Sequence, residues 1–185
     1  MIRLATPKDA PAVASMLVLV MNELAGKFVK SENPMDAFPL FERFFLQEKN
    51  QYSYRNTIVY EDESGVIGSI NAYDGAKLLE LREPFLKYID ETYGFREFLE
   101  EETQAGEFYL DTLGVKPGHQ GKGIGTSLIK AACDRGKELG HAQAGLLVED
   151  KNQSAKRLYE RVGFQSVGKR KFAGGIYSHM LLSLR

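Results

Sequence analysis

The sequence has no surplus of charge of one sign, only one cysteine and no long apolar run. Its 24 Lys and Arg against 25 Asp and Glu give a formal net charge of −1, which argues against the basic surface of a nucleic-acid-binding domain. The lone Cys133 cannot form an internal disulfide, and this fits the reducing cytoplasm. The longest apolar run, Ala10 to Met21, is interrupted by Pro11 and is too short to span a bilayer. We therefore expect no nucleic-acid partner, no signal peptide and no membrane anchor.

Patterns that would bind a metal are also missing. His141 and His179 form no cluster with acidic or cysteine residues at metal-ligand spacing, so we expect no metal site. The 185 residues, of which 43% are hydrophobic, suit a single domain over residues 1–185. The composition does not decide between a monomer and a homodimer.

Hydrophobic periodicity predicts helices packed on a sheet. Apolar residues recur every three or four positions from Val13 to Leu24, which indicates a first helix, and Gly26 is expected to end it. Leu40 to Leu46 indicate a second helix whose aromatic face we interpret as core, with a substrate-pocket wall as the alternative. Residues 57–60 and 66–70 flank a turn-forming run and indicate an antiparallel hairpin.

A strand, a helix and a second strand follow one another in the second half of the chain. Residues 108–115 and 142–148 have strand character and residues 126–139 have helical character, which predicts a β-α-β unit. Residues 154–161 indicate one more helix. Two closing strands are expected to join near Gly174.

The charged stretch from Ala76 to Thr103 is predicted to be a helical insert between two strands. Pro84 and Gly94 are expected to divide it into two or three short helices. Its run Glu100-Glu101-Glu102 is typical of a solvated face.

Four glycines stand directly before the helix of the β-α-β unit, at positions 118, 121, 123 and 125. A Walker A loop needs Ser or Thr after its glycine-lysine pair, but Lys122 is followed by Gly123. The dinucleotide fingerprint needs two residues before its last glycine, whereas Gly121, Gly123 and Gly125 alternate. A turn that only reverses the chain remains as a simple alternative.

The physics of helix ends favours a phosphate site at this turn. The first turn of a helix presents unpaired N–H groups and the positive end of the helix dipole, which together attract an anion. Glycine lets the anion come close, and Lys122 adds a positive charge.

The run Gln120-Gly121-Lys122-Gly123-Ile124-Gly125 matches the Q/R-x-x-G-x-G/A signature of the GNAT superfamily of acyl-CoA-dependent N-acyltransferases. The signature is preceded by Leu113-Gly114-Val115-Lys116-Pro117. A second matching stretch follows it, with Val148 to Asn152, then Leu158-Tyr159-Glu160, then Gly163-Phe164. The sequence resembles this family over most of its length. The resemblance implies a mixed α/β (α+β) fold, with a mostly antiparallel twisted sheet, helices on both faces, splayed central parallel strands and a helical insert before the fourth main strand.

The resemblance also implies where acetyl-CoA is held as co-substrate. Its pyrophosphate is expected at the glycine turn, on the main-chain amides of Gln120, Gly121, Lys122, Gly123, Ile124, Gly125 and Thr126. Its pantetheine arm is expected along Leu113 and Val115 in a bulged strand, where the Leu113 amide is a candidate oxyanion donor. Asn152 corresponds to an asparagine that contacts this arm; as alternatives, it caps the next helix or does both.

Tyr159 corresponds to the tyrosine that protonates the departing thiolate in many members of the family. A phenol with a pKa of about 10 can donate to a thiolate whose acid has a pKa of about 8.5 when the transfer accompanies C–S cleavage. A tyrosine that is simply part of the core is the alternative.

The sequence leaves open which group takes the proton from the acceptor amine. Strand alternation puts Glu107, Tyr109 and Asp111 on one face beside the acyl group. Tyr109 occupies the position where some relatives carry a base glutamate. Three alternatives remain after this departure. Asp111 or Glu107 acts as the base through a water molecule, or the acceptor amine is already neutral when it binds.

The resemblance implies an N-acetyltransferase that moves an acetyl group from acetyl-CoA directly to a primary amine of a small molecule in a ternary complex. The insert is the least family-like part and is expected to cover the acceptor side, where its carboxylates favour a cationic amine. A peptide or protein amine as acceptor and a non-catalytic CoA-binding regulatory module are the alternatives.

Overall fold

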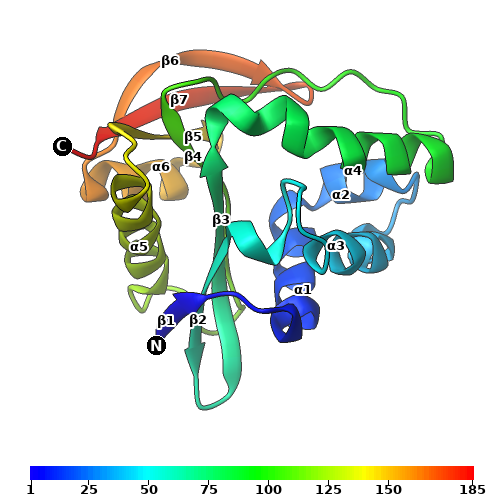
Figure 1. Ribbon diagram of the computed structural model, residues 1–185, viewed down its shortest axis with the longest axis horizontal. Helices are drawn as coiled ribbons and strands as arrows, with labels where there is room; N and C mark the ends of the chain where they lie inside the picture. The colour runs from blue at the N-terminus through cyan, green and yellow to red at the C-terminus, as the bar shows by residue number, and fades with distance from the viewer.

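The computed structural model describes all residues from 1 to 185, and its strands form one sheet with helices on both faces (Figure 1). The seven strands have the order β1-β2-β3-β4-β5-β7-β6, and only β4 and β5 pair in parallel. The strands are β1 (Ile2–Leu4), β2 (Thr57–Asp62), β3 (Gly65–Asp74), β4 (Glu107–Val115), β5 (Gln143–Glu149), β6 (Gln165–Phe172) and β7 (Gly175–Ser183). This mostly antiparallel mixed sheet confirms the expected fold class, including the hairpin of β2 and β3.

Two groups of helices cover the sheet, with α1 to α4 on one face and α5 and α6 on the other (Figure 1). The helices are α1 (Ala10–Met21), α2 (Glu23–Phe28), α3 (Phe38–Phe45), α4 (Leu78–Tyr93), α5 (Ile124–Glu138) and α6 (Gln153–Val162). Short 3₁₀ helices occupy Pro7–Asp9, Pro34–Ala37, Tyr54–Asn56 and Gly75–Lys77. None of the helices combines the length and the apolar character needed to cross a membrane.

Helices α1 to α4 enclose an aromatic core. Phe28 packs edge-on against Phe41, Phe85 and Phe95, with ring centroids 6.5, 5.1 and 5.2 Å apart. Such aromatic pairs contribute about 0.5–1.5 kcal/mol each beyond the burial of their area. Phe41 on α3 is completely buried. The aromatic face of α3 is therefore core, as interpreted from the sequence, and not a pocket wall.

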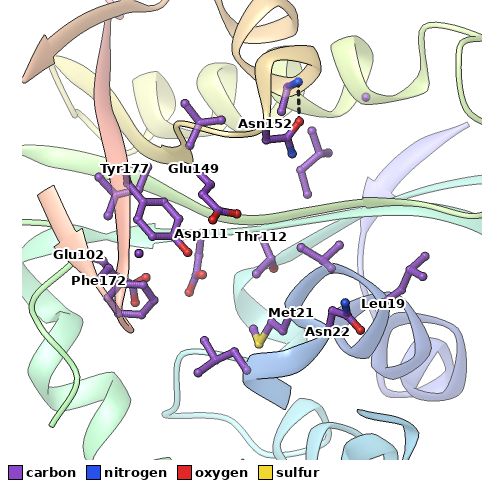
Figure 2. A pocket seen from close by; sticks show the side chains of 18 of the residues that line it. Leu19, Met21, Asn22, Glu102, Asp111, Thr112, Glu149, Asn152, Phe172 and Tyr177 are labelled. Atoms are coloured by element: carbon purple, nitrogen blue, oxygen red, sulfur yellow. Dashed lines mark hydrogen bonds between the residues drawn. The ribbon is translucent and has the colours of Figure 1, made fainter. Parts of the chain in front are cut away.

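The first helix ends earlier than its periodicity predicts. It stops at Met21, and Asn22 adopts a positive φ of 44° before α2 begins. Asparagine tolerates positive φ better than most residues because its short polar side chain can bond locally. Gly26, expected to end the helix, instead lies inside α2. The break brings Met21 and Asn22 to the edge of the site described below (Figure 2).

The insert contains one regular helix rather than two or three. Helix α4 runs through Pro84, and the Leu81 carbonyl, just under one turn earlier, accepts a hydrogen bond from the Gln51 amide at 2.9 Å. Proline disturbs the carbonyls of the preceding turn, and this outside donor compensates one of them. Gly94 ends α4 with a φ of 69°, the left-handed cap that glycine accepts.

Residues 94–106, termed the strap, follow α4 without forming a helix or strand. Arg82 on α4 holds the strap by donating to the carbonyls of Leu99 at 3.2 Å and Glu100 at 3.1 Å. Arg82 also pairs with Glu102 at 2.9 Å, and Glu102 is only 6% exposed. The prediction of a solvated glutamate run is therefore wrong for Glu102, because the charge on α4 draws this carboxylate inside.

The central strands β4 and β5 separate along their length. Three residue pairs join them, from Glu107 opposite Gln143 to Tyr109 opposite Gly145. Beyond Tyr109, β4 remains paired with β3 and β5 with β7. The splayed parallel strands that the resemblance implies are confirmed.

Strand β4 is bulged at Asp111. On β3, Ala72 faces Leu110 while the next partner, Asn71, faces Thr112, so Asp111 has no residue opposite. A bulge of this kind re-aims the side chain of the extra residue. It lies close to the point at which β4 leaves β5.

Candidate active site

A cavity of about 1490 Å³ fills the opening between β4 and β5. One end, termed the turn end, is lined by the glycine turn and by the first residues of α5 and α6. The other end, termed the strap end, is lined by the strap, the break between α1 and α2 and the β6–β7 hairpin tip at residues 172–175.

Main-chain groups of β4 line the middle of the cavity. The Lys116 amide donates to the Ile67 carbonyl at 2.8 Å, which fixes the alternation of bonded and non-bonded pairs along β3 and β4. By this alternation, the N–H and C=O groups of Leu113 and Val115 face away from β3 and toward the opening. The Val115 carbonyl accepts a hydrogen bond from Gln120 Nε2 at 3.3 Å. Polar main chain is thus presented to a ligand without partners from β5.

The glycine turn presents unpaired amides at the start of α5. Gly121 and Gly123 have φ values of 75° and 81°, a region that disfavours side chains. Ser127 donates to the Gly123 carbonyl at 3.0 Å, and the helix has no acidic residue in its first turn. This is the first i to i−4 hydrogen bond of the helix, so the amides of Ile124, Gly125 and Thr126 have no partner within it. This end of the cavity therefore fits an anion such as a pyrophosphate.

Nearly all the residues expected to hold the coenzyme line the cavity. Those that do are Leu113, Val115, Gln120, Gly121, Gly123, Ile124, Gly125, Thr126, Asn152 and Tyr159. Lys122 is exposed and does not line it. The structure gives no support to a role for the Lys122 side chain inside the cavity.

Asn152 caps α6, since its Oδ1 accepts a hydrogen bond from the Ala155 amide at 3.0 Å (Figure 2). Its side-chain nitrogen makes no hydrogen bond to the protein. The cap holds the side chain at the cavity wall with a donor free. Both interpretations of Asn152, helix cap and ligand contact, are thus compatible with its geometry.

Tyr159 on α6 reaches the cavity with its ring packed edge-on against Phe164, at a centroid distance of 6.0 Å. Burial raises the pKa of its phenol to about 12. The phenol is therefore protonated at neutral pH and makes no hydrogen bond within the protein. Its position suits a proton donor.

Asp111 lies at the strap end, where the bulge directs its carboxylate into the cavity (Figure 2). Its Oδ2 accepts hydrogen bonds from the Tyr73 hydroxyl at 2.9 Å and from Gln51 Nε2 at 3.2 Å. Burial, and after it the charge of Glu102, raise the pKa of Asp111 to about 7. A carboxylate with this pKa is half ionised near neutral pH, which suits a general base.

Glu107, the other candidate base, does not line the cavity. It is 3% exposed and lies where β4 is still paired with β5. Its Oε2 accepts a hydrogen bond from Thr103 at 3.1 Å, and its Oε1 is 3.0 Å from His179 Nε2. Alternation put Glu107 on the correct face, but the strands have not separated there, so an acceptor has no access.

No group of three or more His, Cys, Asp or Glu side chains is placed to hold a metal.

Several side chains at the strap end were given no role by the sequence. Glu149 ends β5, and Tyr177 lies directly opposite it on β7. The Phe172 ring packs edge-on against Tyr177 at 6.0 Å, and all three side chains line the cavity near Asp111 (Figure 2). The pairing of β5 with β7 brings them together, and no short motif records it.

Comparison with known proteins agrees with this geometry. An N-acetyltransferase of known structure from Staphylococcus aureus Mu50 has a TM-score of 0.86 and 26% identity, over 98% of this chain and 100% of that one. Mycothiol acetyltransferase of Propionibacterium freudenreichii is 42% identical over 62 residues, which are 34% of this chain and 19% of that protein. A probable spermine N(1)-acetyltransferase of Bacillus subtilis subsp. natto is 34% identical over 83 residues, which are 44% of this chain and 55% of that protein.

The matches thus span about a fifth to a half of these curated relatives, and the relatives are named for different acceptors. A family model described as the acetyltransferase (GNAT) family matches residues 20–164, which is more than half of the chain. The protein therefore belongs to the GNAT family of acetyltransferases.

Proposed function

We propose that the protein transfers an acetyl group from acetyl-CoA to a primary amine of a small, cationic molecule, directly and in a ternary complex. The family uses acetyl-CoA, and one structural neighbour is described with it as cofactor. The observation that carries the proposal is the position of Asp111. Its carboxylate has a pKa near neutrality and lies at the strap end of the cavity, next to the part of β4 whose main-chain groups are free.

The turn end supplies what the coenzyme needs. The free amides of Ile124, Gly125 and Thr126 suit its pyrophosphate, and the main-chain groups of Leu113 and Val115 suit the amides of its pantetheine arm. Because these contacts come from the main chain, they depend on backbone conformation and little on side-chain identity.

Three groups divide the chemistry. Asp111 takes a proton from the ammonium form of the acceptor, which frees the lone pair for attack on the thioester carbon, and the second proton of the nitrogen passes to solvent once the C–N bond has formed. The Leu113 amide donates to the carbonyl oxygen as negative charge develops on it. Tyr159 gives its proton to the sulfur as the C–S bond breaks. The products are the N-acetyl amide and the free thiol of CoA.

A small acceptor is favoured because two segments close the strap end. The Ala173 amide at the tip of the β6–β7 hairpin donates to Glu100 Oε2 on the strap at 3.0 Å. Arg170 on the same hairpin donates to Gln104 at 2.9 Å. These bonds join the strap to the hairpin over the end of the cavity. A folded protein substrate would have to part them.

A cationic acceptor is favoured by the charges that remain unpaired. Asp111 and Glu149 line the strap end, and neither forms an ion pair. Arg82, a cation in the same wall, is already paired with Glu102. The rings of Phe172 and Tyr177 add faces that attract an ammonium group. One of the similar proteins is named for spermine, a polyamine.

Release of free thiol from acetyl-CoA in the presence of an amine panel tests the proposal. The panel contains putrescine, spermidine, a neutral aromatic amine and a peptide with a free N-terminus. We expect turnover with the aliphatic polycations and a higher KM for them in Glu149→Gln. Preference for the peptide would favour the alternative acceptor class. Binding of CoA without turnover across the panel would favour a regulatory module.

A further inference from the structure

A buried ion pair lies behind the proposed base. The side chains of Arg82 on α4 and Glu102 on the strap are 4% and 7% exposed, and their charged atoms are 2.9 Å apart. The second oxygen of Glu102 accepts a hydrogen bond from the Tyr109 hydroxyl at 3.2 Å. Both members of the pair also line the strap end of the cavity.

Two tyrosines connect this pair with Asp111. Tyr73 and Tyr109 are directly opposite each other on β3 and β4, and their rings pack edge-on at 5.8 Å. Tyr73 donates its hydroxyl to Asp111, while Tyr109 donates to Glu102. Each carboxylate is thus held by one member of a packed tyrosine pair. Tyr109, which by the resemblance occupies the position of a base glutamate in some relatives, holds the Glu102 carboxylate through its hydroxyl.

The charges near Asp111 act in opposite directions. Glu102 raises the pKa of Asp111 by repulsion, whereas Arg82 and the hydrogen bonds from Tyr73 and Gln51 lower it. The groups that face Asp111 are Gln51 and Tyr52 ahead of β2, Tyr73 on β3, Arg82 on α4, Glu102 on the strap, Tyr109 on β4, and Glu149 and Tyr177 at the ends of β5 and β7. Within this set, Arg82 is the only cation.

We propose that Arg82 and Glu102 are positioning residues that set the proton affinity of Asp111, and through it the pH at which the acceptor amine is activated. The proposal rests on the assignment of Asp111 as the base. Because Glu102 belongs to the strap and Arg82 fastens the strap, the segment that closes the acceptor end also tunes the base. A purely structural ion pair would hold the strap without this effect.

The test replaces each charge singly and then both together. In Glu102→Gln, the unpaired Arg82 cation stabilises the ionised Asp111, so its titration midpoint should fall by about one pH unit. In Arg82→Gln, the cation that lowers the pKa of Asp111 is lost, so the midpoint should rise at pH values where Glu102, whose own pKa is raised by burial, is ionised. In the double variant both charges are absent, and the midpoint should return toward that of the native protein. The reversal of sign cannot come from a general loosening of the fold.

Two measurements follow the midpoint. Carbon-13 NMR of aspartate-labelled protein reports the Asp111 carboxyl directly, with Asp111→Asn used for assignment and no substrate needed. The acidic limb of the pH profile of kcat/KM for putrescine, measured at saturating acetyl-CoA, reports the same group during turnover. The surface pair Arg96–Asp90, at 2.7 Å and on the same insert, provides the matched control, and Asp90→Asn should leave both readouts unchanged.

The outcomes separate this proposal from the function on which it rests. An unchanged NMR midpoint in the folded single variants would overturn it and leave the ion pair with a structural role. A moved midpoint with an unmoved kinetic limb would show that Asp111 is not the base, and both proposals would fall together. If one single variant does not fold, the other single variant and the double variant still establish the sign.

Discussion

The two ends of the cavity are built in different ways. The turn end and the adjoining β4 wall come mainly from one continuous segment, residues 113–126, which presents backbone amides, and the start of α6 adds Asn152. The strap end collects side chains from distant parts of the chain, among them Gln51, Glu102 and Glu149. The first end requires a conformation, and a short motif can record it. The second requires a tertiary arrangement, which is free to differ between relatives that keep the same coenzyme.

The two ends also differ electrostatically. The turn end offers partial positive charges from a helix start without an acidic side chain in the first turn. The strap end holds the buried carboxylate of Glu102 and the half-buried carboxylates of Asp111 and Glu149, and the pKa of Asp111 is raised to about 7. Coenzyme affinity and acceptor chemistry should therefore respond to separate substitutions, which can be tested in both directions.

The largest effect is expected from Asp111→Asn. Loss of a general base lowers kcat/KM by roughly 1000-fold, within the usual range for this role. The affinity for CoA should stay unchanged, because Asp111 lies at the strap end. Steady-state kinetics and calorimetry measure the two quantities. A parallel loss of CoA affinity would contradict the division of the cavity.

The same substitution should stabilise the protein at high pH. The pKa of Asp111 is raised from 3.8 to about 7 on folding. Between these values the unfolded chain releases a proton that the folded protein keeps, so the stability of the native protein falls as pH rises and levels off above about 7. Asn does not ionise, so denaturant unfolding should show Asp111→Asn to be more stable by about 2–4 kcal/mol at pH 8 and by little at pH 4. Equal differences at both pH values would argue against a buried, protonated Asp111.

Tyr159→Phe is expected to lower kcat by about 100-fold by removing the proton donor to the sulfur. Phe keeps the contact with Phe164, so thermal unfolding should change little. A thioester analogue with a more acidic thiol as leaving group should restore part of the rate. Failure of such a leaving group to help would favour a core role for Tyr159.

Gly123→Ala should weaken the turn end alone. A Cβ at a φ of 81° costs about 1–2 kcal/mol, although no atom of the protein obstructs it. We expect a loss of unfolding free energy of this size and a CoA Kd raised about tenfold. Gly168→Ala is the matched control, since Gly168 has open space and no positive φ. A changed KM for the acceptor at saturating CoA would count against independent ends.

The smallest effect is expected from Glu100→Gln, which weakens the bond between the strap and Ala173. The residue is at the surface, so the loss of unfolding free energy should be small, with the acceptor KM raised roughly twofold and kcat unchanged. Glu97→Gln, also on the strap and without an ion pair, is the control. Identical acceptor KM values for the two variants would show that the strap and hairpin do not close the site.

The sequence predicts most of the fold because hydrophobic period and turn chemistry act locally. The β2–β3 hairpin and the β-α-β unit around α5 both follow from residues close together in the chain. Two of the errors lie where a distant group intervened, whereas the early end of α1 has a local cause at Asn22. The backbone of Gln51 supports α4 beside Pro84, and Arg82 draws Glu102 inside.

The same distinction applies to the site. The motif indicated residues 120–126, and all of them except the exposed Lys122 line the cavity. Alternation along β4 selected both Glu107 and Asp111, and it could not tell them apart, because their difference depends on where β5 leaves β4. Glu149 and Tyr177 were missed because strand pairing, not sequence spacing, brings them together.

The three residue pairs between β4 and β5 are the whole hydrogen-bonded seam between two halves of the sheet, β1 to β4 and β5 to β7. Beyond Tyr109 and Gly145, β4 and β5 lack the hydrogen bonds that two fully paired strands would share. In the proposed function, the amide groups of acetyl-CoA would lie between β4 and β5 and take the place of the missing hydrogen bonds. The co-substrate would then be part of the sheet as well as a reactant. Its binding would join the two halves of the sheet, and its release would separate them again in each turnover.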